Sequence, residues 1–174
     1  MSTRNSSGFL DITGIEYFRF EEDFVEENVR CIPMIVRFKL DAACIKLKLA
    51  EWSKFSVPER AELATRSCET QEERQRYHDF LAGLVFKYTG ALATPLQPEL
   101  EPAWADSFVI PQQLAERAEQ LNRKIAVSEW ESLSHLQRFA LIKLCRPGHE
   151  SKNFIKALDE FQIGQSNPRL QPCG

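Results

Sequence analysis

Apolar residues recur at helical spacing along most of the chain, and this pattern predicts a mainly helical protein. The clearest helix begins after Thr70, which forms a capping-box pattern with Glu73, and ends near Gly90, a residue type common at helix C-termini. The apolar positions of this segment form one continuous face, made of Tyr77, Phe80, Leu81, Leu84, Val85 and Tyr88. The segment is therefore expected to pack one side against a core.

Helix-start signals recur elsewhere in the sequence. Proline suits the first turn of a helix, so helices are expected from Pro33 to about residue 43 and from Pro111 to about residue 122. A last helix is expected from about residue 151 to residue 163. Capping-box spacings predict three further helix starts, at Ser56 with Glu59, Ser128 with Glu131 and Ser134 with Gln137.

Strand signals are weak in comparison. Only two short stretches alternate between apolar and polar residues, at 45–49 and 124–127. These two stretches are expected to pair with each other as a small two-stranded ribbon.

The chain is similar to itself at an offset of 78 residues. Trp52 aligns with Trp130 and Arg60 with Arg138, and eight of the 32 positions from residue 32 to residue 63 are identical to their counterparts. Internal similarity of this kind predicts a tandem duplication. The expected fold is a helical domain built from two similar helical halves related by an approximate two-fold axis.

The domain boundaries follow from this repeat and from the prolines between the halves. We expect a single domain over residues 9–163, in which an aromatic, acidic arm precedes the first half and packs its aromatic side chains on the domain. The first half covers about 32–90, a proline-rich connector 91–109 and the second half about 110–163. The polar ends, 1–8 and 164–174, are expected to be flexible.

Composition narrows the classes of function. The 174 residues are 43% hydrophobic and 27% charged, with a formal net charge of −3 and a pI near 5.7. This acidic balance argues against general binding to nucleic acid or anionic membranes. No apolar run approaches the roughly 20 residues that span a bilayer, and the acidic first thirty residues resemble no targeting signal, so a cytoplasmic location is expected. Five cysteines without a CxxC pair are typical of free thiols.

The repeated Glu, Trp and Arg positions of the two halves allow two interpretations. Each arginine, Arg60 and Arg138, could bind an anion through a planar bidentate contact beside its tryptophan. Alternatively, each pairs with the glutamate of its own half, Glu51 or Glu129, and stacks on the tryptophan as a structural brace. The structural interpretation is favoured because the glutamate and the arginine are repeated together.

The segment after the predicted helix 134–144 has no counterpart in the first half and is the candidate anion site. Cationic side chains gather there near the start of the last helix, and helix N-termini attract anions. The alternative is that these cations lie at the C-terminus of the preceding helix, where the helix dipole favours positive charge. The candidate ligand-binding residues are Arg138, Lys143, Arg146, His149, Lys152 and Asn153.

A second set of residues is a candidate for partner binding. Arg30, Arg37 and Lys39 lie in a dense mixture of basic and apolar residues, and Trp104 lies in the connector. The alternative for the three basic residues is pairing with the acidic arm. No spacing suits a metal site, no nucleophile motif such as GxSxG occurs, and no phosphate-binding glycine loop is present, so neither catalytic residues nor a cofactor are predicted.

Four segments resemble the nitrate reductase-associated protein family, known mainly from cyanobacteria. They are residues 18–24 (FRFEEDF), 30–41 (RCIPMIVRFKLD), 45–52 (IKLKLAEW) and 130–153 (WESLSHLQRFALIKLCRPGHESKN), and the resemblance covers roughly residues 15–163. It implies a small cytoplasmic protein, often encoded beside genes for nitrate assimilation and molybdenum cofactor synthesis, without an established biochemical activity. No catalytic residues follow from it.

Three hypotheses of function follow. The leading one is a non-enzymatic accessory or assembly factor that binds nitrate reductase or a protein of molybdenum cofactor biosynthesis. The alternative is a protein that binds a small anion or a cofactor phosphate, sensing nitrate or molybdopterin through the candidate anion site. An enzyme is the third hypothesis, since the sequence offers no acid, base or nucleophile constellation.

Overall fold

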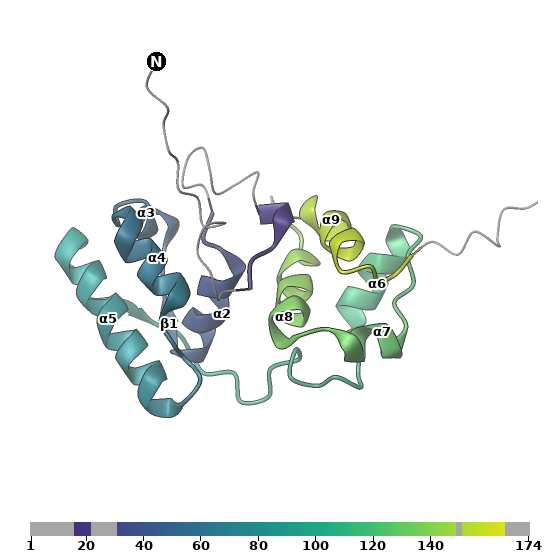
Figure 1. Cartoon of the computed structure of the whole chain (residues 1–174), viewed down its shortest axis with the longest axis horizontal. Coiled ribbons are helices and arrows are strands. Elements are labelled where there is room, and N and C mark those ends of the chain that lie inside the picture. Colours follow the sequence, from purple (N-terminus) through teal and green to yellow (C-terminus); the bar gives the residue numbers. More distant parts are fainter. Residues whose placement is uncertain (1–15, 22–30, 149–150, 166–174) are drawn as a thin grey trace, which may run out of the picture. The chain divides into compact units, whose positions relative to one another are not determined.

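The computed structural model describes residues 16–21, 31–148 and 151–165. The chain divides into two compact units, Met1–Leu100 and Glu101–Gly174, and the boundary falls inside the connector predicted at 91–109. Both units are mainly helical, as the apolar spacing predicts (Figure 1). No helix in the described part of the chain combines the length and the apolar character needed to cross a bilayer.

Unit 1 is a group of helices with one small ribbon. Its core gathers Trp52, Leu63, Tyr77 and Leu81, each at most 1% exposed. The apolar face predicted for residues 71–89 supplies much of this core, since α5 packs against α2 and α3. The elements are η2 (Arg19–Glu21), α2 (Met34–Ala42), β1 (Ile45–Lys46), α3 (Leu49–Trp52), α4 (Val57–Thr65), α5 (Gln71–Thr89) and β2 (Thr94–Pro95).

The predicted ends of α4 and α5 are confirmed by hydrogen bonds. The Ser56 hydroxyl accepts from the Glu59 amide while the Glu59 carboxylate accepts from the Ser56 amide. Thr70 and Glu73 form the same reciprocal pair at the start of α5. Gly90 ends α5 in the left-handed conformation, with φ of 69°.

The start of α2 depends on a residue far from it in the sequence. Pro33 is the N-cap residue and offers no side-chain cap, but Glu21 Oε1 accepts a 2.6 Å hydrogen bond from the Met34 amide. Within the N-terminal arm, Phe18 and Phe20 are 3% and 4% exposed, and their rings stack at 5.2 Å. The expectation that the arm buries aromatic side chains is confirmed for these two residues, while residues 22–30 of the arm lie outside the described part.

The predicted ribbon is wrong in its pairing. Residues 45–46 do form a strand, but the partner of this strand is the connector segment 94–95, with Ile45 opposite Pro95 in antiparallel register. A further hydrogen bond from the Leu96 amide to the Cys44 carbonyl extends the contact. The alternating pattern identified the strand at 45–46 correctly. A strand of two residues carries no information about its partner, however. The second strand was missed because proline is rare in strands.

Unit 2 is also helical. Its elements are α6 (Gln112–Gln120), α7 (Val127–Ser132), α8 (His135–Leu144) and α9 (Asn153–Glu160). Helix α8 buries residues on most of its circumference and packs on α9. The largest fully buried side chains of the unit are Leu114, Trp130, Phe139, Leu141, Leu144, Phe154 and Leu158.

The predicted cap at Ser134 is confirmed, and the one at Ser128 is wrong. Ser134 and Gln137 exchange the expected bonds at the start of α8. Helix α7 begins two residues earlier than predicted, so its cap is made by Glu129, whose carboxylate accepts a 2.7 Å bond from the Ala126 amide. The side chain three positions inside the helix, and not the serine hydroxyl, satisfies the free backbone donor here.

Local structure corresponds between the units at the offset of 78 residues. Helices α2 and α6 start 78 positions apart and have nine residues each. Ser56 and Ser134 have the same backbone angles, φ −68° and ψ 161°. Cys44 and Asn122 both have positive φ, 53° and 56°. The correspondence lies in helix boundaries, caps and backbone angles within each unit.

Candidate functional site

In unit 2, the side chains of α7 and α8 hold a segment of the connector. Arg138 is 4% exposed and lies with its Cζ atom 5.9 Å from the centre of the Trp130 ring. Its Nε atom donates a 2.8 Å hydrogen bond to the carbonyl of Trp104, and Trp130 Nε1 donates a 3.0 Å bond to the carbonyl of Asp106. We call this arrangement the connector clasp. The two carbonyls lie two residues apart at a turn of the connector, in which the Ala105 amide donates a 2.8 Å hydrogen bond to the Pro102 carbonyl.

The clasp also holds side chains of the connector. The Trp104 ring lies 5.2 Å from the His135 ring at the first position of α8. Asp106 Oδ1 accepts hydrogen bonds from the amides of Phe108 and Val109, at 2.8 and 3.2 Å. These two apolar side chains are left 69% and 61% exposed. Trp104 therefore has a defined position within unit 2.

The bracing interpretation of Arg138 is confirmed for its tryptophan and wrong for its glutamate. Both glutamates of the repeated pattern, Glu51 and Glu129, instead cap their own short helices by accepting from the backbone amides of Lys48 and Ala126. Among the described residues, neither repeated arginine forms an ion pair with its glutamate. A carboxylate three residues inside a helix start finds free amides nearer than the guanidinium.

Unit 1 contains the same pairing of a tryptophan with an arginine. Arg60 Cζ lies 5.9 Å from the Trp52 ring, the distance found in the clasp. In the described residues, however, Arg60 Nε is buried without a hydrogen-bond acceptor. Burial lowers the pKa of the Arg60 guanidinium. At the first position of α4, where α8 has His135, Val57 is 59% exposed.

The residues of the candidate anion site are placed in different surroundings. Lys143 Nζ lies 4.9 Å from the Phe139 ring centre, whereas Arg146 and Lys152 are exposed. Arg138 faces inward, in the connector clasp. His149 lies outside the described residues.

Asn153, the first residue of α9, is the buried member of that set. Its side chain is 3% exposed, and its Oδ1 atom has no hydrogen-bond partner in the described part of the chain. An unpaired buried acceptor is costly, so it calls for a water or a donor group. The Oδ1 atom attracts donors, and only the amide nitrogen of this side chain suits an anion.

The basic residues predicted for partner binding are engaged within unit 1. Arg37 donates from Nε to the Ile32 carbonyl at 2.8 Å and from Nη2 to Cys31 Sγ at 3.2 Å. Lys39 Nζ donates to carbonyls at the C-terminus of α4, those of Ala64 and Arg66, at 2.5 and 2.8 Å, and burial lowers its pKa. Arg30 lies outside the described residues. Three of these four acceptors are main-chain carbonyls, of which the sequence offers no sign.

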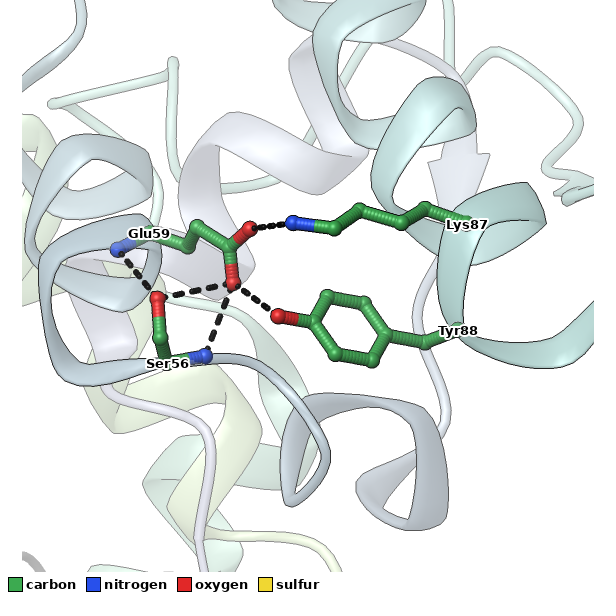
Figure 2. Close-up of polar contacts among 4 residues, drawn as sticks. All are labelled: Ser56, Glu59, Lys87 and Tyr88. Atoms are coloured by element: carbon green, nitrogen blue, oxygen red, sulfur yellow. Dashed lines mark hydrogen bonds and ion pairs between the residues drawn. The ribbon is translucent and has the colours of Figure 1, made fainter.

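A polar cluster between α4 and α5 escaped the sequence analysis (Figure 2). The Glu59 carboxylate accepts from Lys87 Nζ at 2.8 Å and from the Tyr88 hydroxyl at 2.7 Å, in addition to the amide and hydroxyl of Ser56. The bond from Lys87 and the other donors lower the pKa of Glu59 to about 2, and the same carboxylate raises the pKa of Lys87. Both carboxylate oxygens of Glu59 accept hydrogen bonds, and two of the donors come from the other helix. The cluster therefore fastens α4 to α5.

The described residues contain no group of side chains assembled for metal ligation or for thiol chemistry. These residues contain no set of three histidine, cysteine, aspartate or glutamate side chains close enough to hold a metal ion. The four described cysteines are free, and burial raises the pKa of two of them, Cys68 and Cys145. A raised thiol pKa disfavours the reactive thiolate at neutral pH.

Comparison with known proteins gives one match. A family model described as conserved nitrate reductase-associated protein matches residues 17–161, which is most of the chain. Neither the curated proteins nor the solved structures give a significant match.

Proposed function

The chain belongs to the conserved nitrate reductase-associated protein family, and we propose that it is a non-enzymatic accessory or assembly factor that binds nitrate reductase or a protein of the molybdenum cofactor pathway. The family match over residues 17–161 carries this proposal, because the family is described by an association with the reductase. We also propose a cytoplasmic location.

The chemistry of the described side chains supports a binding role. The connector clasp uses Arg138 and Trp130 to hold main-chain carbonyls, which is recognition of a polypeptide segment and involves no bond-making chemistry. The polar cluster around Glu59 fastens α4 to α5. Exposed Phe108 and Val109 offer apolar contact area beside the clasp.

The test is direct binding between purified proteins. The full-length chain is immobilised, and nitrate reductase and the enzymes of molybdenum cofactor synthesis from the same organism are passed over it separately. We expect one of these proteins to bind with a Kd in the micromolar range or tighter, and an unrelated molybdenum-free reductase of similar charge is the control. Absence of binding to every nitrate-assimilation protein would contradict the proposal.

We further propose that the two units arose by tandem duplication and pack as one domain over residues 9–163 about an approximate two-fold axis. The shared helix boundaries and backbone angles at the 78-residue offset support the duplication. Residual dipolar couplings measured on the full chain test the packing. Independent alignment of the two units would contradict the single domain.

The second candidate function is binding of a small anion or cofactor phosphate at Arg138, Lys143, Arg146, His149, Lys152 and Asn153. It is supported by two exposed cations, Arg146 and Lys152, shortly before the N-terminus of α9. Thermal denaturation in the presence of nitrate, molybdate or phosphate tests it, since a ligand that binds the folded state raises the melting temperature. No rise at millimolar anion, against chloride at equal ionic strength, would contradict this function.

A further inference from the structure

Two neighbouring apolar side chains of unit 2 are exposed between the connector clasp and α6. Phe108 is 69% exposed and Val109 is 61% exposed. Single exposed apolar residues are common on soluble proteins and need no explanation. Here an aromatic and an aliphatic side chain leave the same short piece of main chain, so they offer more apolar area than either residue alone. We call them the apolar pair.

The main chain that carries the apolar pair is fixed on both sides. Before the pair, the carbonyl of Asp106 accepts a 3.0 Å hydrogen bond from Nε1 of Trp130, which is fully buried. The Asp106 carboxylate accepts from the amides of Phe108 and Val109 themselves, at 2.8 and 3.2 Å. After the pair, α6 follows at once, and its Leu114 is fully buried. The pair is therefore presented on an ordered backbone, and its binding to a partner requires little further ordering.

The surrounding sequence is acidic and contains no cation. From residue 88 to residue 116 the chain has no lysine, arginine or histidine, and it has four acidic residues, Glu99, Glu101, Asp106 and Glu116. In the described part of the chain, none of these four carboxylates lies in an ion pair. Their negative charge is thus not compensated within the unit that carries them. A surface of positive charge would complement it.

We infer that the apolar pair is a docking surface for a partner protein whose surface has an apolar pocket bordered by lysine or arginine side chains. The Phe108 ring enters the pocket, Val109 covers its edge, and the carboxylates of Glu101 and Asp106 face the basic border. This inference rests on the proposed binding function, and it names the surface that this chain uses and the chemistry of the surface that it meets.

The two parts of the surface have different effects on binding. An aromatic side chain that fills a pocket is the kind of residue that carries much of the affinity of an interface. The carboxylates favour encounter with a basic surface, and this effect weakens as salt screens the charges. The same carboxylates disfavour an anionic bilayer as the binding surface, since its headgroups repel them.

The exposure of the pair can be measured in the free protein. A soluble paramagnetic agent broadens the NMR signals of side chains that it can approach. The ring signals of Phe108 in the full-length protein should broaden strongly, whereas those of Phe139, which is 1% exposed, should stay sharp. Equal protection of the two rings would show that another part of the chain covers the pair, and it would overturn the inference.

The apolar part is tested by substitution in the full-length chain. The Kd is measured for the nitrate reductase or the molybdenum cofactor enzyme that binds the natural protein. Phe108→Ser should weaken this binding at least about 10-fold, because the pocket loses its aromatic group. Val127→Ser is the matched control, since Val127 is 50% exposed at the first position of α7, and it should change the Kd by less than about 2-fold.

The charged part is tested by a substitution that keeps the backbone contacts. Asp106→Asn retains the Oδ1 acceptor for the two amides and removes the negative charge. We expect it to weaken binding about 3-fold at low salt and to reduce the loss of affinity that the natural protein shows as the ionic strength rises. Glu131→Gln, at an exposed acidic position of α7, is the control and should leave both quantities unchanged.

Several outcomes would overturn the inference. If the partner binds the natural protein and Phe108→Ser with the same Kd, the proposed function stands and the docking surface fails. An affinity that does not depend on salt would remove the basic border. A natural protein that sediments as a dimer, and as a monomer after Phe108→Ser, would make a second copy the occupant, and co-sedimentation with phosphatidylglycerol vesicles would make it a membrane. If no nitrate-assimilation protein binds the natural chain, the proposed function fails and the inference fails with it.

Discussion

Arg138 donates a 2.8 Å hydrogen bond from Nε to the carbonyl of Trp104, 34 residues earlier in the chain. The guanidinium is buried against the Trp130 ring, so it cannot exchange this acceptor for water. We expect Arg138→Lys to lower the free energy of unfolding by about 2–4 kcal/mol, because an ammonium offers neither the planar stack nor a donor at the Nε position. Urea denaturation followed by tryptophan fluorescence measures the change.

Arg117→Lys is the matched control for that substitution. Arg117 donates a 3.1 Å bond to Gln120 along the exposed side of α6. Its replacement should change the free energy of unfolding by less than about 0.5 kcal/mol. Equal effects of the two variants would contradict the structural role assigned to Arg138.

Glu59 contributes stability to unit 1 that is lost at acid pH. Its pKa falls from 4.5 to about 2 in the folded protein, mainly through the bond from Lys87. A depressed carboxyl pKa contributes stability that is fully present above pH 4.5 and is lost as the pH falls through about 2. We therefore expect Glu59→Gln to flatten the decline in unfolding free energy between pH 4.5 and pH 2.

The natural sequence indicates that the glutamine would still cap the helix. At the matching position of α8, Gln137 accepts from the Ser134 amide at 2.9 Å. The variant should thus lose the Lys87 ion pair and keep the cap, which separates charge from capping. Glu72→Gln, which removes an exposed charge from the first turn of α5, is the control, and a wild-type pH slope in Glu59→Gln would refute the assignment.

Most contacts between near neighbours in the sequence were predictable, apart from the cap expected at Ser128, and contacts between distant residues were not. The caps at Ser56, Thr70 and Ser134 are set within four residues, so residue type and spacing were sufficient. The cap of α2 is different, since Glu21 lies 13 residues before the Met34 amide. No local pattern connects these two positions.

The same difference between local and distant contacts holds at the candidate site. The sequence placed a tryptophan and an arginine together in each unit, and their 5.9 Å stacking is what the eight-residue spacing produced. It could not identify what the arginine binds, because the acceptor is a backbone carbonyl of the connector and any residue type supplies one. Pairing with glutamate was therefore predicted where a main-chain contact exists.

Gly83 lies in the middle of α5 and has no described contact that requires a glycine. A Cβ atom added there meets nothing within 4 Å, and the residue is exposed. We expect Gly83→Ala to raise the free energy of unfolding by about 0.5–1 kcal/mol, because alanine loses less backbone entropy in a helix. Gly90→Ala should destabilise by about 1 kcal/mol, since Gly90 has φ of 69°. Thermal denaturation of both variants compares the signs.

Cys44 occupies a backbone conformation that its side chain disfavours. Its φ is 53°, and the matching residue of unit 2, Asn122, has φ of 56°. Asparagine tolerates the left-handed region better than other residues with a Cβ atom, apart from aspartate, because its short amide bonds locally to the backbone. The Cys44 carbonyl accepts from the Leu96 amide through main chain alone, so a substitution leaves this bond in place.

We therefore expect Cys44→Asn to raise the free energy of unfolding by about 0.5–1 kcal/mol and Cys44→Val to lower it by about 1–2 kcal/mol. The valine variant is the control, because a β-branched side chain keeps the apolar character and increases the backbone strain. Chemical denaturation under reducing conditions measures both. A more stable valine variant would show that packing around this partly buried position outweighs the backbone conformation.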